Sequence, residues 1–130
     1  EDFRMTSMSG TFGRRDGVKD LDTWCDLRKA MNTLGFDPIA QKDIMKVTCA
    51  LLHASNLSFL EKGCEASEVD CSNHSLPPTL SLMGVSSQIL NKALCTSTIE
   101  ARGEKLIKNK TVQQATKALE ALIKATYGAL

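Results

Sequence analysis

Residues 96–130 read TSTIEARGEKLIKNKTVQQATKALEALIKATYGAL, and this stretch decides what kind of fold the chain adopts. Two short runs, 98–100 and 105–107, flank the turn 101–104, where Gly103 can adopt a positive φ. This pattern predicts a β-hairpin over about 97–108. Residues 111–114 then read Thr-Val-Gln-Gln, which fits a capping box and predicts the start of a long C-terminal helix over 111–130.

The predicted C-terminal helix has one apolar face, which consists of Val112, Ala115, Leu119, Leu122, Ile123 and Thr126. Twenty residues at ~1.5 Å each make a rod of ~30 Å, and a two-stranded hairpin alone is marginal in water. Both elements therefore need a large surface to pack against. The helical pattern also reaches Leu130 without a terminating Gly, Pro or polar tail, so we expect a fragment truncated at both ends.

Upstream of the hairpin the sequence predicts further helices, so the expected fold class is mainly α. Asp20 or Asp22 opens a helix that ends at Gly35, and Asp37-Pro38 opens another that runs to about His53. A short extended piece is expected at 55–60, one helical turn at 79–83, and a short helix from Ser86 or Ser87 to Leu94. Residues 1–19 lack a period and predict a loop, whereas the stripe of Trp24 and Met31 predicts core.

Residues 61–78 differ in composition from their surroundings. Gly, Ser, Asn and Pro alternate there with acidic residues. Segments of this kind carry few side chains that could build a core. The sequence therefore predicts a variable surface loop over 61–78.

Composition narrows the possible compartments and partners. A net charge of +1 argues against a dedicated nucleic-acid binder and against a polybasic membrane arm. No apolar run approaches the ~18 residues of a membrane span, and the first residues lack the features of a signal peptide. The five cysteines are odd in number and irregularly spaced, unlike a disulfide framework. We expect a cytoplasmic protein without nucleic-acid or membrane-spanning partners.

Candidate catalytic and metal-binding residues are weak throughout the chain. Residues 10–13 read Gly-Thr-Phe-Gly, but no Gly-Lys-Ser/Thr follows that could hold phosphates. Cys64, Cys71 and His74 lack a fourth ligand and the spacing of a zinc site, and Cys49 with His53 forms only one pair. No third group orients a Cys–His nucleophile. We therefore expect no catalytic, cofactor-binding or metal-binding residue in this chain.

The predicted hairpin carries charges of both signs, at Glu100, Arg102, Glu104, Lys105, Lys108 and Lys110. Such a ribbon can simply be solvated. It can equally be a charged protrusion that touches a partner, because exposed loops often carry binding and peripheral charges steer encounter. Residue chemistry alone leaves both interpretations open.

Ordered matches along nearly the whole chain resemble the myosin motor domain. They include 16–20 (DGVKD), 50–53 (ALLH) with 56–59 (NLSF), 82–85 (LMGV), and 96–99 (TSTI) with 102–104 (RGE). The resemblance continues through 112–115 (VQQA) and 118–124 (ALEALIK) to Tyr127, whereas 61–78 does not align. Ile123 and Gly128 depart from the family pattern.

The resemblance implies a part of the upper actin-binding subdomain, between switch I and switch II of a P-loop NTPase. It makes 96–110 the cardiomyopathy loop, with inferred actin-binding residues Ile99, Glu100, Arg102, Gly103, Glu104, Lys105 and Lys108. In the family an acidic or phosphorylatable residue lies sixteen positions before the acid of an Asp-Ala-Leu-Ala-Lys-like motif. That acid is Glu120 here, so the regulatory acidic position is Glu104. A permanent acid implies that actin engagement needs no phosphorylation of the loop.

The phosphate loop and the switches of the family lie outside this chain. The resemblance therefore implies a parent that is an actin-activated, MgATP-hydrolysing motor of the cytoskeleton. The expected partners of this chain are the actin filament and the remainder of the myosin head. Two alternatives are a free-standing helical protein-interaction module without catalysis and a small metal or thiol protein built on Cys64, Cys71 and His74.

Overall fold

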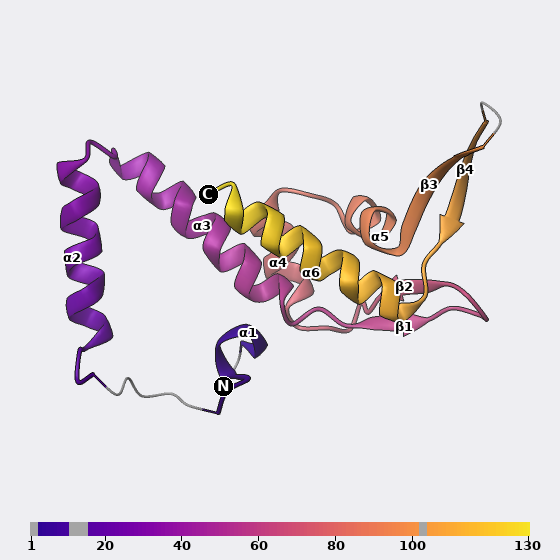
Figure 1. The fold of residues 1–130 in the computed structure, drawn as a ribbon, viewed down its shortest axis with the longest axis horizontal. Coiled ribbons are helices and arrows are strands. Elements are labelled where there is room, and N and C mark those ends of the chain that lie inside the picture. The colour runs from indigo at the N-terminus through magenta and orange to yellow at the C-terminus, as the bar shows by residue number, and fades with distance from the viewer. Residues whose placement is uncertain (1–2, 11–15, 102–103) are drawn as a thin grey trace.

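The computed structural model describes residues 3–10, 16–101 and 104–130, and it is mainly helical (Figure 1). Two small antiparallel hairpins, β1–β2 and β3–β4, accompany the helices. The elements in chain order are α1 (Arg4–Ser7), α2 (Asp20–Thr33), α3 (Pro38–Ala54), β1 (Phe59–Glu61), β2 (Ser67–Val69), α4 (Leu76–Met83), α5 (Ser87–Cys95), β3 (Thr96–Ala101), β4 (Glu104–Asn109) and α6 (Val112–Gly128). The expectation of a mainly α fold with a hairpin and a long C-terminal helix is confirmed.

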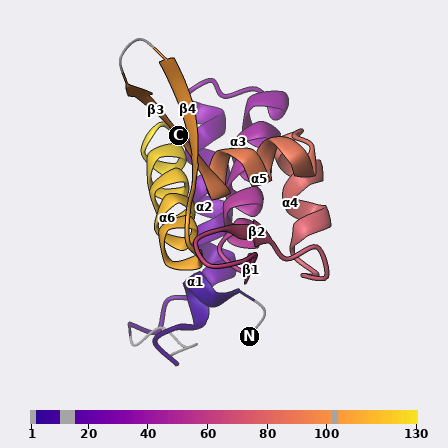
Figure 2. The ribbon, with the colours of Figure 1, turned by 90° about the vertical axis from the view of Figure 1, so that its right-hand side faces the viewer.

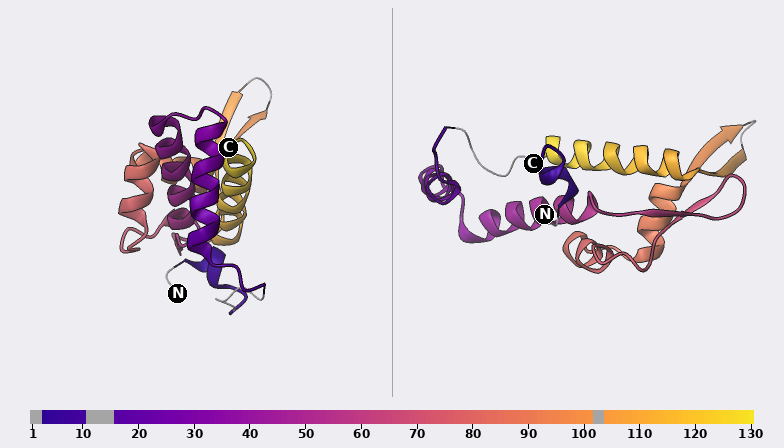
Figure 3. Two further views of the ribbon diagram at one scale, coloured as in Figure 1. Left: turned by 90° about the vertical axis from the view of Figure 1, so that its left-hand side faces the viewer. Right: turned by 90° about the horizontal axis from the view of Figure 1, so that it is seen from below.

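The core lies where α3, α4, α5 and α6 meet the β1–β2 hairpin. Its buried side chains come from these elements and from the connection between α3 and β1, and they are Leu51, Ala54, Leu57, Val69, Leu76, Leu90, Leu94, Cys95, Ala115, Leu119 and Ile123. Helix α6 runs alongside α3 through much of its length (Figures 1 and 3). Ile123, which departs from the family pattern, is one of the side chains that α6 buries.

Local capping explains where the two long helices begin. The Asp37 side chain accepts a hydrogen bond from the Ala40 amide at 2.7 Å, and Pro38 occupies the first helical position of α3. At α6, the Gln114 amide donates to the Thr111 hydroxyl and the Thr111 amide donates to the Gln114 side chain. The capping box expected from the sequence is therefore confirmed. Gly128 is the last residue of α6 and does not break it earlier.

Helix α2 contradicts the expectation that Trp24 and Met31 belong to the core. Trp24 is 38% exposed, and no residue of α2 is buried. The helix lies apart from the α3–α6 layer (Figure 1), and the Arg28 guanidinium lies 5.6 Å from the centre of the Trp24 ring. The helical period predicted from the sequence is present, but no element of the part of the chain that the structure describes buries the apolar side of α2.

Residues 61–78 contradict the expectation of a surface loop. Strand β2 pairs with β1 in the register Phe59↔Val69, and both Ser67 and Val69 are buried. Helix α4 begins at Leu76, with two prolines in its first turn, where a missing amide hydrogen is tolerated. Strand pairing and packing against α5 override the loop-like composition of the segment.

The N-terminal segment also differs from the loop expected at 1–19. A single helical turn, α1, lies against the end of α3, where the Phe3 and His53 rings meet edge to face at 5.0 Å. The Arg4 amide donates to the Asn56 side chain at 2.8 Å. Part of this segment, 1–2 and 11–15, lies outside the described residues. Among the described helices none is long and apolar enough to cross a membrane.

The core of α5 generates a first prediction. Leu94 is 2% exposed, whereas Ile89 on the same helix is 61% exposed. Leu94→Ala should lower the free energy of unfolding by ~2–5 kcal/mol, because it removes apolar side-chain atoms that are buried on folding and leaves a cavity in their place. Ile89→Ala, the matched control, should change it by less than ~0.5 kcal/mol. Urea unfolding followed by circular dichroism measures both, and equal losses would contradict this description of the core.

The uncovered helix α2 generates a second prediction. An isolated helix of 14 residues is marginal in water, and α2 buries no side chain here. In the 130-residue chain alone, α2 amides should exchange with deuterium within about tenfold of unfolded-chain rates. Amides in the middle of α6 should be protected at least ~100-fold. Equal protection of α2 and α6, measured by mass spectrometry, would show that α2 needs no other partner.

Candidate functional site

The β3–β4 hairpin stands out from the helical body as a narrow ribbon (Figure 2). Its register runs from Thr96↔Asn109 at the base to Ala101↔Glu104 at the tip. Every residue of β4 is exposed. The hairpin expected over 97–108 is confirmed, and the residues of β4 are exposed on both faces of the ribbon.

The register divides the expected site residues between two faces, because directly paired residues share a face of an antiparallel ribbon. Ile99 pairs with Leu106 and Ser97 with Lys108, on the same face as Glu104. Glu100 pairs with Lys105 on the opposite face, beside the Thr98↔Ile107 pair. A single flat partner surface therefore cannot contact the whole set in the same way.

The structure thus brings Ile99, Glu104 and Lys108 together on one face, and Glu100 and Lys105 on the other. Opposite charges in direct cross-strand pairs, as at Glu100 and Lys105, stabilise a ribbon modestly. Arg102 and Gly103, also expected in the site, lie outside the described residues, as does the expected positive φ of Gly103.

The base of the ribbon is anchored in the core. Helix α5 ends at Cys95 and β3 begins at Thr96, so no linker separates them. The Lys110 amide donates to the Cys95 carbonyl at 2.9 Å, which closes the ribbon one position below the last strand pair. The Cys95 side chain is 1% exposed, and burial raises the pKa of its thiol above the ordinary value. The ribbon is therefore continuous with the packed end of α5.

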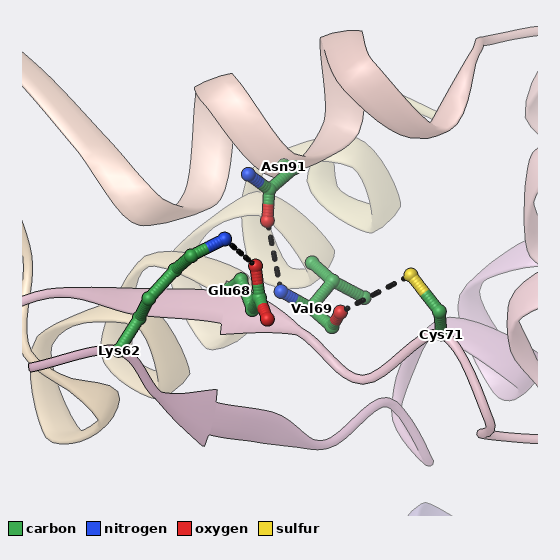
Figure 4. Close-up of polar contacts among 5 residues, drawn as sticks. All are labelled: Lys62, Glu68, Val69, Cys71 and Asn91. Carbon is green, nitrogen blue, oxygen red and sulfur yellow. Dashed lines mark hydrogen bonds and ion pairs between the residues drawn. The ribbon is translucent and has the colours of Figure 1, made fainter.

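Hydrogen bonds from strand β2 brace this base. The buried Ser67 hydroxyl donates to the Lys110 carbonyl at 2.8 Å. The Val69 amide donates to the Asn91 side chain of α5 at 2.8 Å, as Figure 4 shows. The residues expected to form a loop thus fasten α5 and the start of α6 to one another.

An ion pair spans the turn between β1 and β2. The Lys62 ammonium contacts the Glu68 carboxylate (Figure 4), and this hydrogen-bonded carboxylate raises the pKa of Lys62. The Lys62 side chain is exposed and that of Glu68 is partly exposed, so solvent screens the pair and it contributes little to stability.

The structure gathers no metal site in the residues that it describes. No group of three or more His, Cys, Asp and Glu side chains there is arranged to hold a metal ion. Cys71 is one of the residues considered above as a zinc ligand. Its Sγ lies 3.7 Å from the Val69 carbonyl oxygen, to which the thiol donates a hydrogen bond (Figure 4). The neighbouring Asp70 carboxylate accepts hydrogen bonds from the Ser72 hydroxyl and amide, which lower the pKa of Asp70.

Sequence reasoning missed two kinds of residue at this site. Leu106 and Ile107 are exposed on opposite faces of the ribbon, although apolar strand residues normally predict burial. Ser67 and Asn91 were missed because their roles depend on contacts across the fold. For Leu106 and Ile107 the sequence did contain a signal. Consecutive residues of a strand face opposite sides of the ribbon, so at least one of the two side chains is either exposed to solvent or covered by another protein surface.

Comparison with known proteins places the whole chain within one family. The profile of the myosin head (motor domain) matches residues 1–130. The chain is 32% identical to human (Homo sapiens) unconventional myosin-Vc over 130 residues, which is 100% of this chain and 7% of that protein. It is 28% identical to unconventional myosin-Ic of Gallus gallus over 121 residues, 93% of this chain and 12% of that protein. The chain therefore spans only a small part of the relatives it matches.

The braced base generates a third prediction. Ser67→Ala should lower the free energy of unfolding by ~1–2 kcal/mol, because the Lys110 carbonyl loses a buried donor. Ser97→Ala is the matched control, since the Ser97 hydroxyl lies 3.5 Å from the Lys108 carbonyl on the exposed ribbon. It should cost less than ~0.5 kcal/mol. Chemical denaturation compares the two variants, and a larger loss for Ser97→Ala would refute the brace.

Proposed function

This chain belongs to the myosin head (motor domain) family, and we propose that it forms part of an actin-based cytoskeletal motor in which the β3–β4 hairpin binds the actin filament. The exposure of the ribbon on both faces, above a braced base, carries this proposal. A protruding element that binds a filament under load must be accessible along its length and firmly held at its root. The hairpin has both properties.

The inferred contact residues are Ile99, Glu100, Arg102, Gly103, Glu104, Lys105 and Lys108. Within this set Glu104 is the regulatory acidic position, and its permanent charge makes engagement independent of phosphorylation. Leu106 and Ile107 join the proposed contacts, because exposed apolar side chains gain from burial in an interface. Their opposite placement suits a partner that receives the ribbon between two of its own surfaces.

The remainder of the head is the second proposed partner. It would cover the apolar side of α2, where Leu21, Trp24 and Leu27 are exposed. It would also carry the nucleotide site, since the family's phosphate loop and switches do not occur in this sequence. MgATP binding and hydrolysis are thus assigned to other segments of an actin-activated ATPase in the cytoplasm.

The alternative of a free-standing helical module has less support. A self-sufficient domain of this size buries the apolar faces of its own helices. Here α2 buries none of its residues. The chain accordingly resembles one part of a larger assembly more than a complete binding module.

The test is a charge-neutralising substitution in the motor protein that carries this chain. Glu104→Gln should raise the KM for actin in the actin-activated ATPase by about 2–5-fold, because one exposed charge contributes ~0.5–1 kcal/mol at an interface edge. The maximal rate should change little, since the nucleotide site is elsewhere. The rise should shrink at high ionic strength.

Asp43→Asn is the matched control, because it removes one exposed charge from α3, which is not part of the ribbon. It should leave the KM for actin unchanged. Ile99→Ala should weaken co-sedimentation with actin filaments as well, through lost apolar contact. If Glu104→Gln and Ile99→Ala both bind and respond to actin as the wild type does, the hairpin is not the contact.

A further inference from the structure

The corner between α2 and α3 contains a buried polar side chain in an otherwise exposed region. Gln41, in the first turn of α3, is only 3% exposed. Its side-chain nitrogen Nε2 donates to the Asn32 side chain at 2.8 Å and to the Phe36 carbonyl at 2.8 Å. One side chain therefore ties the last turn of α2 and the linker to α3.

The backbone of this corner is also closely specified. Gly35 has φ 84° and donates its amide to the Asn32 carbonyl at 3.1 Å, while the Phe36 amide donates to the Met31 carbonyl at 3.0 Å. This pair of bonds is a Schellman motif, which ends α2 and turns the chain. Asp37 then caps α3. Gln41 binds the Phe36 carbonyl, which the backbone bonds of this motif do not use.

The oxygen of the same amide shows which contacts favour the buried position of Gln41. Oε1 is buried and has no hydrogen-bond partner among the residues that the structure describes. A buried acceptor without a donor costs free energy, so the oxygen does not stabilise the side chain in this position. The favourable part of its position is the pair of bonds that Nε2 donates.

The orientation of α2 depends on this corner, because no residue of α2 is buried against the rest of the described chain. Fourteen residues make α2 about 20 Å long, so a rotation of ~10° at the corner moves its far end by roughly 3–4 Å. Packed surfaces do not accommodate displacements of that size. A fixed corner angle is therefore needed for α2 to meet any partner in register.

We propose that Gln41 is a latch that fixes the angle between α2 and α3, and with it the direction in which Leu21, Trp24 and Leu27 are presented to the rest of the head. The first half of the proposal concerns this chain alone. The second half rests on the function proposed above, because the rest of the head is the surface that α2 would meet. Gln41 is in this sense a positioning residue.

The experiment is hydrogen–deuterium exchange of the full-length protein that carries this chain, without actin or nucleotide. Gln41→Met keeps the length of the side chain but removes both donated bonds. It should speed exchange of amides 31–37 by about tenfold, as expected for the loss of one to two net hydrogen bonds. Exchange in α6 should not change. Gln113→Met, at an exposed position of α6, is the matched control and should leave the corner unaffected.

A double-mutant cycle separates a latch from general destabilisation. Asn32→Ala removes one of the two bonds and should speed exchange at the corner by about threefold. The double variant Asn32→Ala/Gln41→Met should match Gln41→Met alone, because the shared bond can be lost only once. Unchanged exchange over 31–37 in Gln41→Met would overturn the latch, and so would an equal rise in α6.

The outcome does not depend on actin binding. A protein that shows the latch but no actin activation would disprove the proposed function and leave the corner intact as a finding. If the protein is activated by actin but Gln41→Met does not change exchange at the corner, the latch is disproved and the proposed function stands.

Discussion

The arrangement depends on one junction, where the Lys110 amide donates to the Cys95 carbonyl and the Ser67 hydroxyl donates to the Lys110 carbonyl. At this point the end of α5, the root of the ribbon, strand β2 and the cap of α6 all meet. Lys110 contributes both its amide and its carbonyl to the junction, so the backbone there is held from two sides. If the junction were loose, the ribbon would be a two-stranded hairpin alone in water, which is marginal.

This junction makes the ribbon an extension of packed helices instead of a tethered loop. Movement of α5 or α6 as a rigid element would carry the hairpin with it, and force on the hairpin would reach both helices. Transmission between distant sites in proteins proceeds through elements that have discrete, packed arrangements. The N-terminal corner at Gln41 has a similar design on a smaller scale, with side-chain bonds that set the direction of an otherwise uncovered helix.

Local signals in the sequence predicted the elements whose ends are locally determined. The Thr111–Gln114 box and the Asp37 cap located α6 and α3, and the turn at 101–104 located the ribbon. The loop-like composition of residues 61–78 does not predict β2, because this strand is only three residues long and is held by Asn91 and Lys110, which are distant in sequence. Periodicity predicts a core position for Trp24, which is exposed in the structure, because periodicity identifies an apolar face but not the surface that covers it. The two faces of the hairpin became separable only once the register was known.

We propose that the β3–β4 ribbon binds actin while the rest of a motor covers α2. Electron cryomicroscopy of the full-length protein on actin filaments tests it most directly. We expect the ribbon, including Ile99, Glu104 and Leu106, to lie in the actin interface. We also expect Leu21, Trp24 and Leu27 to be buried against other parts of the head. A filament-bound structure in which the ribbon remains in solvent, with actin contacted only by other elements, would contradict it.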